Sequence, residues 1–182
     1  VFSILIRYLI VNNYSIVYRS ISDFGMSYFI FSTVVLILIH DCYFYCSHKL
    51  IHNKKLFFIH KRHHLSTNPT PWSAFSFGPI EAVIQVIWLP IIILILPLHP
   101  FSLLIWSLWM MIMNVIGHLG FEIYSKEFLN SLIGKILNAS THHNLHHSRS
   151  KSNFGLYFTF WDKIMGTEDK NYRSTFEKIK NN

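Results

Sequence analysis

Three long apolar runs dominate the pattern of hydrophobic and polar positions along the chain. Residues 28–47, 82–98 and 101–117 contain almost no strongly polar side chains. At a rise of 1.5 Å per residue, a helix of about seventeen residues is roughly 26 Å long, close to the ~30 Å hydrocarbon core of a bilayer. The pattern therefore predicts an all-α integral membrane protein with three clear transmembrane helices, built as a single domain over 1–182.

The last two apolar runs are joined by His99-Pro100 alone, so we expect them to form a tight antiparallel hairpin. Such a hairpin returns the chain to the side of the membrane on which 28–47 ends. Fourteen of the sixteen Lys and Arg residues then lie on that side, and only Arg7 and Arg19 are left over. By the positive-inside tendency this side is the cytoplasmic face. The protein is thus expected to be multi-pass, with its polar loops in the cytoplasm.

Composition agrees with a membrane protein rather than a nucleic-acid-binding one. The chain is 51% hydrophobic and 14% charged, whereas soluble domains are about 25% charged. The formal charge is +7, but no Lys or Arg falls between Arg62 and Lys126. We therefore interpret the basic residues as topology signals and expect no nucleic-acid partner. Two cysteines, Cys42 and Cys46, exclude a disulfide framework.

Histidines are concentrated in two windows, 48–64 and 142–147, which hold nine of the twelve in the chain. The motif HKLIH places two imidazoles four residues apart on one helix face. The motifs HKRHH and HHNLHH repeat a spacing of three and four residues, so each cluster can point several rings into a common space. His118 follows the last apolar run and falls on the same side. Eight to ten convergent histidines are too many for one metal ion and suit two.

The remaining histidines receive other interpretations. His40 is expected to pack at the end of its span, and His99 lies in the far hairpin turn. For His142 the sequence leaves two roles open, a metal ligand or a support for His146. Nearby carboxylates could accept hydrogen bonds from the ligand rings and fix their tautomers; these are Asp41, Glu81, Glu122 and Asp162.

From about residue 41 to 167 the sequence resembles the fatty acid hydroxylase / sterol desaturase family of membrane-bound di-iron, oxygen-dependent enzymes. HKLIH, HKRHH and HHNLHH match its histidine motifs, and NFGLYFTFWDKIMGT is similar to its closing segment. The passages NPTPWSAFSFGPIEA, PLHP and GHLGFE are most similar to the lathosterol oxidase (sterol C-5 desaturase) branch.

The resemblance implies a bundle of about four transmembrane helices with a cytoplasmic helical cap closing over a di-metal cage. Because the chain begins at Val1 and has three clear spans, an amino-terminal span is expected to be missing. The two irons would be bound by His48, His52, His60, His63, His64, His118, His143, His146 and His147, with His142 as a tenth candidate. Lys49 and Asn144 depart from residues often seen at their positions, which concerns substrate orientation more than metal binding.

The expected reaction is the oxygen-dependent hydroxylation or desaturation of a sterol-like or fatty-acyl lipid. No flavin, haem or dinucleotide-binding motif is visible, so electrons would come from a separate protein, a small haem or iron–sulfur carrier with its reductase. The aromatic run 154–161 and the residues Trp72, Phe75 and Phe77 either line the substrate cleft or pack against the metal-binding helices.

Two other functions remain as alternatives. A histidine-rich metal transporter would need ionisable residues inside its spans, and these spans offer only Gln85, Asn114 and, near an end, Asp41. A membrane zinc hydrolase of non-protease type also uses histidine ligands. Proteolysis is disfavoured because Lys49 stands where an HExxH motif carries its Glu.

Overall fold

The structure is a computed structural model that describes residues 2–181. Within this range the regular elements are helices, and the one β pairing is an isolated bridge between Leu137 and Phe158. The α-helices are α1 (Phe2–Val11), α2 (Gly25–Ile51), α3 (Phe57–His60), α4 (Pro79–Val86), α5 (Trp88–Ile95), α6 (Pro100–Gly117), α7 (Ser140–Arg149), α8 (Phe160–Ile164) and α9 (Tyr172–Asn181). Short 3-10 turns are η1 (Ile21–Asp23), η2 (His63–Leu65), η3 (Pro71–Phe75) and η4 (Phe128–Asn130).

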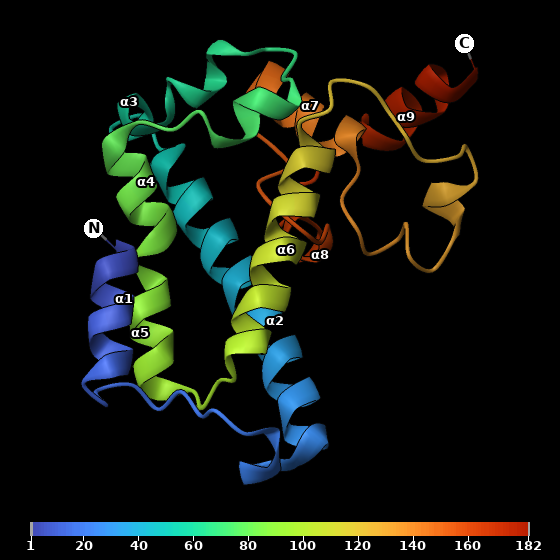
Figure 1. The fold of residues 1–182 in the computed structure, drawn as a ribbon. Coiled ribbons are helices and arrows are strands. Elements are labelled where there is room, and N and C mark those ends of the chain that lie inside the picture. The colour runs from blue at the N-terminus through green and yellow to red at the C-terminus, as the bar shows by residue number, and fades with distance from the viewer. Residues whose placement is uncertain (1, 182) are drawn as a thin grey trace.

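Helices α2 and α6 form the axis of the molecule and end at the same pole (Figure 1). They have 27 and 18 residues and are the two helices long and apolar enough to cross a membrane. The predicted spans 28–47 and 101–117 are therefore confirmed as helices, and α2 is longer than predicted. Only 33% of the most apolar stretch of α2 and 22% of that of α6 are buried within the protein.

Large apolar side chains on these two helices face outward. Phe31 and Val34 on α2, and Leu104 and Leu108 on α6, are all exposed. A soluble protein rarely exposes so large an apolar surface, whereas a bilayer covers it without cost. The two helices are therefore those of a membrane protein.

The third predicted span, 82–98, is two helices rather than one. Helix α4 ends at Val86 and α5 begins at Trp88, with Ile87 between them. Pro90 explains the break, because proline has no N–H to donate to the carbonyl of residue 86 and its ring crowds that carbonyl.

The expected tight hairpin of this span with α6 does not form as predicted. Helix α5 runs antiparallel to α6, but it packs closely against α1, while α6 packs most extensively along α2 (Figure 1). A four-residue connection from Leu96 to His99 separates the two helices. Trp88 and Ile93 of α5 still reach Leu36 of α2 and Trp106 of α6 in one buried apolar cluster.

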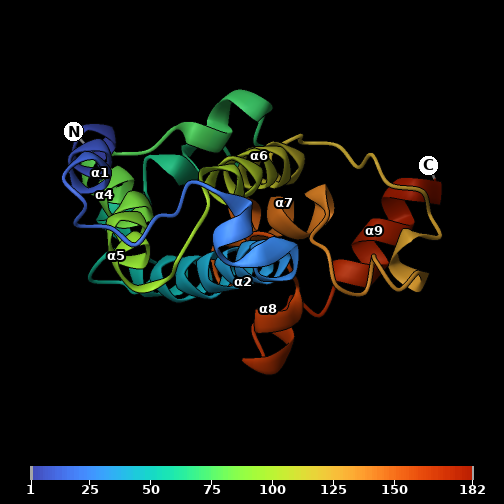
Figure 2. The ribbon, with the colours of Figure 1, turned by 60° about the horizontal axis from the view of Figure 1, so that its bottom comes forward.

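The polar part of the protein lies at the pole where α2 and α6 end. There α7 lies beside α6, and α9 covers the outer face of α7 (Figure 2). Leu145 of α7 packs with Tyr172 and Phe176 of α9 in a second apolar cluster. The N-terminus of α7 is capped by Glu122, whose Oε2 accepts hydrogen bonds from the backbone N and hydroxyl of Thr141 at 3.0 and 2.7 Å.

Candidate metal centre

Nine histidines converge at the polar pole in two adjacent groups. The first group is His48, His52, His60, His64 and His146, and the second is His63, His118, His143 and His147. Within each group the candidate ligand atoms lie within 4.8 Å of one another. All nine rings are buried except that of His52, which is half-buried. Nine of the ten histidines predicted from the sequence are thus brought together.

Most of these histidines lie at the end of a helix or in a turn directly after one, and His143 lies within α7. His48 lies in the last turn of α2 and His52 caps it, while His118 caps α6. The rings of the HKRHH motif lie on α3 and η2, and those of the third motif lie on α7. The sequence predicts that each motif serves one common space, but HKRHH and HHNLHH each contribute to both groups.

Adjacent rings meet through their Nε2 atoms. In the first group, the Nε2 of His60 is 3.0 Å from that of His48, and the Nε2 of His64 is 3.1 Å from that of His52 and 3.0 Å from that of His146. In the second group, the Nε2 of His118 is 3.1 Å from that of His63. The same atom is 3.1 and 3.2 Å from the Nε2 atoms of His143 and His147, respectively.

The opposite nitrogen, Nδ1, is occupied by an acceptor in most of the rings. His48, His52 and His146 donate from Nδ1 to the carbonyl oxygens of Phe154, Ser150 and Ser152 at 2.8, 3.0 and 2.8 Å. His60 Nδ1 lies 2.5 Å from Glu81 Oε1. In the second group, His118 and His147 donate to the carbonyls of Asn114 and Ser66 at 2.7 and 2.9 Å. A carbonyl can only accept, so these rings carry their proton on Nδ1 and present an Nε2 lone pair.

Burial keeps the rings neutral. Burial, together with neighbouring histidines for His52, His118 and His147, lowers the pKa of His52 and His147 to about 3 and that of His64 and His118 to about 4. Buried neutral imidazoles with converging lone pairs have no proton to share between them. Such an arrangement is stable when a cation lies between the rings.

The spacing of the nitrogens fits this interpretation. Two nitrogens that bind one ion at about 2.1 Å and at right angles lie about 3.0 Å apart. The observed separations of 3.0–3.2 Å agree with it in both groups. The residues present therefore fit two metal ions, one per group, each with histidine ligands only.

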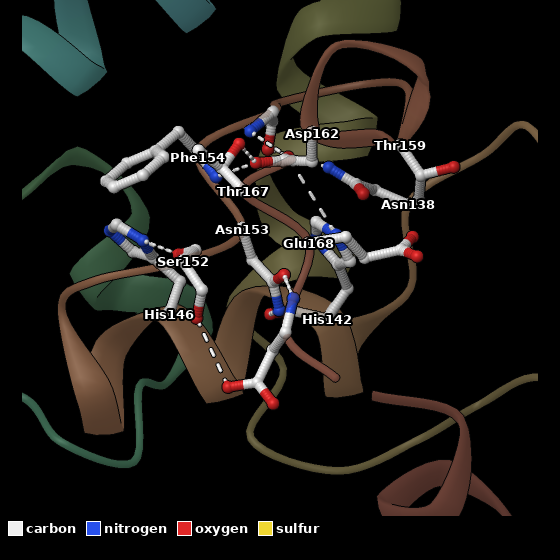
Figure 3. A network of polar contacts seen from close by, with 12 residues as sticks. Asn138, His142, His146, Ser152, Asn153, Phe154, Thr159, Asp162, Thr167 and Glu168 are labelled. Carbon is white, nitrogen blue, oxygen red and sulfur yellow. Dashed lines mark hydrogen bonds and ion pairs between the residues drawn. The ribbon is translucent and has the colours of Figure 1, made fainter. Parts of the chain in front are cut away.

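His142, the tenth candidate, lies outside both groups. It is completely buried, and neither of its ring nitrogens has a hydrogen-bond partner among residues 2–181. Its Nε2 points toward Asp162, 3.9 Å from Oδ2 (Figure 3). Its ring packs edge-on against Tyr172. Helical geometry explains this, because positions 142 and 143 point about 100° apart on α7.

Of the four carboxylates predicted to orient the rings, one does so directly. Glu81 contacts His60, whereas the other three bind backbone groups instead. Asp41 accepts from the N–H of Tyr157 at 2.9 Å, and Glu122 caps α7. Asp162 accepts from two N–H groups of the loop that follows α7. The prediction that these carboxylates accept hydrogen bonds from the histidine rings is thus right for Glu81 and wrong for the other three.

The ring acceptors that sequence reasoning missed are backbone carbonyls. Those of Ser66, Asn114, Ser150, Ser152 and Phe154 each bond to a ring Nδ1. Every residue has a carbonyl, so no residue type could signal these positions. The sequence also does not reveal the left-handed backbone of Ser150, with φ of 57°, because serine rarely adopts this conformation.

An apolar cavity of about 340 Å³ lies between α2, α4, α5 and α6, directly below the histidines. Phe44 and Phe77 line it, and their rings lie 5.0 and 5.4 Å from those of His48 and His63, respectively. Phe75 also lines it, so two of the three aromatic residues predicted near the cleft, Phe75 and Phe77, contribute to the wall. The run 154–161 contributes Leu156. Trp72 does not, since it is 92% exposed.

The two histidines that belong neither to the windows nor to a metal-binding group, His40 and His99, make contacts elsewhere in the fold. His40 is buried in α2, with its Nδ1 2.6 Å from the hydroxyl of Tyr157, and it lines the cavity rather than packing at the end of its span. His99 lies at the opposite pole, where its Nδ1 accepts from the N–H of Phe101 at 3.1 Å and caps α6.

The sequence is similar to those of known proteins named as sterol desaturases and lathosterol oxidases. The chain is 27% identical over 158 residues to a delta(7)-sterol 5(6)-desaturase of Gibberella zeae, covering 86% of this chain and 47% of that protein. It is 32% identical to lathosterol oxidase of Rattus norvegicus, covering 85% of this chain and 51% of that protein. It is 29% identical to a delta(7)-sterol 5(6)-desaturase of Saccharomyces cerevisiae, covering 91% and 44%.

The chain spans about half the length of these curated relatives. No solved structure matches it. The profile of the fatty acid hydroxylase family matches residues 33–167, a range that contains all nine converging histidines. The protein belongs to the fatty acid hydroxylase family.

Proposed function

We propose that the protein is a di-iron, oxygen-dependent membrane oxidoreductase that hydroxylates or desaturates a lipid. The observation that carries the proposal is the pair of histidine groups with converging Nε2 atoms, set above an apolar cavity. The relatives named for acting on sterols support a sterol-like lipid, with a fatty-acyl lipid as the other candidate.

The two histidine groups would hold one iron each. When bound, the irons supply the oxidation of an unactivated C–H bond with O2 as co-substrate. The protein contributes neutral rings, fixed in orientation by their Nδ1 acceptors, and a buried setting for the ions. His142 is assigned no ligand role in this proposal.

The apolar cavity is the proposed substrate site. Trp88, Leu89, Trp106 and Met110 give it an almost wholly apolar wall, and Asn114 joins that wall to the second histidine group. Such a site binds a lipid through burial of apolar surface and keeps water away from the reacting bond. Of the polar side chains in this wall, His40 and Asn114 bond to Tyr157 and Ala74, so we assign the orientation of a substrate hydroxyl or headgroup to Gln85.

The membrane arrangement forms part of the proposal. Helices α2 and α6 would cross the bilayer with their histidine ends toward the cytoplasm, the side that the basic residues favour. The segments from 118 onward, with α7, α8 and α9, would form the cytoplasmic cap. A separate electron carrier, a small haem or iron–sulfur protein with its reductase, would dock on this side.

Metal analysis combined with lipid profiling tests the proposal. We expect detergent-purified protein to hold about two irons per chain, and a host that expresses it to gain a hydroxylated or desaturated lipid. A host that expresses His143→Ala should gain none, although it produces the same amount of protein. Protein that binds no iron after reconstitution, and that yields no oxidised lipid with a reductant, would contradict the proposal. Tightly bound zinc in place of iron would favour a hydrolase.

A further inference from the structure

The loop formed by residues 150–155 faces the first histidine group along one side. Its carbonyls at Ser150, Ser152 and Phe154 accept hydrogen bonds from three of the five rings. The hydroxyl of Ser150 also lies 3.2 Å from the Nδ1 of a fourth ring, His64. The orientation of the first group therefore depends on the backbone of one short loop.

The backbone of this loop is not one that its sequence favours. Ser150 and Asn153 have φ angles of 57° and 60°, the left-handed region that side-chain-bearing residues seldom adopt. Such a conformation is unfavourable and persists only where surrounding contacts hold it. The 150–155 loop thus needs an external support to keep its carbonyls aimed at the rings.

Asp162 supplies that support from the start of α8. Its Oδ1 accepts from the N–H of Phe154 and its Oδ2 from the N–H of Gly155, both at 2.8 Å (Figure 3). The hydroxyl of Thr167 donates to Oδ1 at 2.7 Å. The carboxylate is completely buried and is therefore held in one position by these three donors.

Asn153 connects the same loop to α7 and to the segment after α8. Its Nδ2 donates to the carbonyl of His142 at 2.8 Å, and its Oδ1 accepts from the N–H of Asp169 at 2.7 Å. Its own N–H donates to the carbonyl of Thr167 at 2.9 Å. Thr167 thus contacts both Asp162 and the loop, and closes the network.

The second histidine group has no contact of this kind with the loop. His118 is oriented by Asn114 in α6 and His147 by Ser66 in the loop after η2. The hydrogen bonds between the carbonyls of the 150–155 loop and ring nitrogens therefore reach the first group and not the second.

We propose that Asp162 is a positioning residue for the first metal ion, acting through the carbonyls of the 150–155 loop on His48, His52 and His146. This inference rests on the proposed binding of one ion by each group. Acceptors that orient metal-binding histidines typically change metal affinity 10- to 100-fold when they are lost.

Substitution by asparagine is a sharp test, because Asn keeps the size of the side chain. Its single oxygen can accept from Phe154 and Thr167, but its NH2 then faces the N–H of Gly155, which is also a donor. We expect Asp162→Asn to bind the first ion 10- to 100-fold more weakly and the second ion as before. Titration of metal-free protein with Co²⁺, followed by its visible absorption, measures both sites. Glu177→Gln, an exposed carboxylate on α9, is the matched control and should bind two ions normally.

Double variants identify the site that is lost. In a His118→Ala background, which removes a ligand of the second group, adding Asp162→Asn should weaken the remaining site 10- to 100-fold. In a His52→Ala background the same addition should change little, because the first site is already lost. Equal effects in both backgrounds, or two intact sites in Asp162→Asn, would overturn the inference. Wild-type protein that binds no metal would contradict the proposed function instead.

A milder pair of variants keeps the test decisive if Asp162→Asn does not fold. Thr167→Val removes the hydroxyl that donates to Asp162 and retains the shape of the side chain, while Thr167→Ser retains the hydroxyl. We expect Thr167→Val to bind metal more weakly at the first site alone, and Thr167→Ser to bind metal at both sites like the wild type. Equal binding by the two variants, or equal weakening of both sites, would contradict the role of Asp162.

Discussion

Individual side chains at this site are distinguished by what their two ring nitrogens contact. In a proposed ligand histidine such as His146, Nδ1 donates to a carbonyl and Nε2 meets another ring. In His142 neither nitrogen has a hydrogen-bond partner within 2–181, although the ring is completely buried. Two neighbours in one motif can therefore differ fully in role.

Replacement of His142 tests this distinction. We expect His142→Phe to retain two metal ions per chain, because the ring contributes to neither group. The unpartnered nitrogens cost stability, so an apolar ring of similar size should leave the melting temperature equal or higher. His146→Ala is the comparison and should lose the first ion. A loss of metal in His142→Phe would restore His142 as a ligand.

At the scale of elements, the C-terminal ends of α2 and α6 supply histidines to the proposed metal site. Helices α2 and α6 end at the same pole and deliver His48 and His118 there, and α7 lies across the gap. Helices α4 and α5, on either side of the break at Ile87, both line the apolar cavity. The break therefore falls in the wall of the proposed substrate site.

Two neighbouring methionines on α6 allow the cavity to be tested. Met110 lines it, whereas Met111 faces outward and is exposed. We expect Met110→Trp to fill part of the cavity and reduce lipid turnover at least tenfold, with metal content unchanged. Met111→Trp should retain turnover, since its side chain points away from the cavity. Similar activities in the two variants, measured by lipid profiling of the host, would contradict the assignment of the cavity.

At the scale of the whole molecule, the apolar surface of α2 and α6 faces outward. Its exposed side chains form the kind of surface that a bilayer covers in a membrane protein. The polar pole can then bury its histidines in a region that the helices hold in place.

A charge on the outward face of α6 tests whether this surface faces lipid. Leu108 is exposed near the middle of the helix, and an arginine at the centre of a span costs about 3 kcal/mol for insertion. We expect Leu108→Arg to reduce the membrane-inserted fraction several-fold in a fractionation experiment. Leu132→Arg, exposed in the loop between α6 and α7, should insert like the wild type. Normal insertion of Leu108→Arg would argue that α6 does not face lipid.

Acid should destabilise the metal-free protein as a whole. In the folded state the pKa of His52 and His147 is about 3 and that of His64 and His118 about 4, against 6.5 for an exposed histidine. The unfolded chain therefore binds protons that the folded protein does not, and stability falls as pH decreases below about 6.5. Each group contributes at most about 1.4 kcal/mol per pH unit. Thermal unfolding of metal-free protein in detergent at pH 7.5 and 5.5 checks this, and equal melting temperatures would contradict it.

The sequence by itself determined the two long helices, the class of site and nearly all of its histidines. Apolar runs of the length of a bilayer leave few alternatives to a spanning helix, and clustered imidazoles have few uses other than metal binding. Only the tertiary structure decided which histidines share a group. His63 and His64 are neighbours in the chain, yet they lie in different groups, because successive residues of a tight helical turn point in different directions. It also decided what orients the rings, since those acceptors are mainly backbone carbonyls, which every residue carries and only the path of the chain can aim.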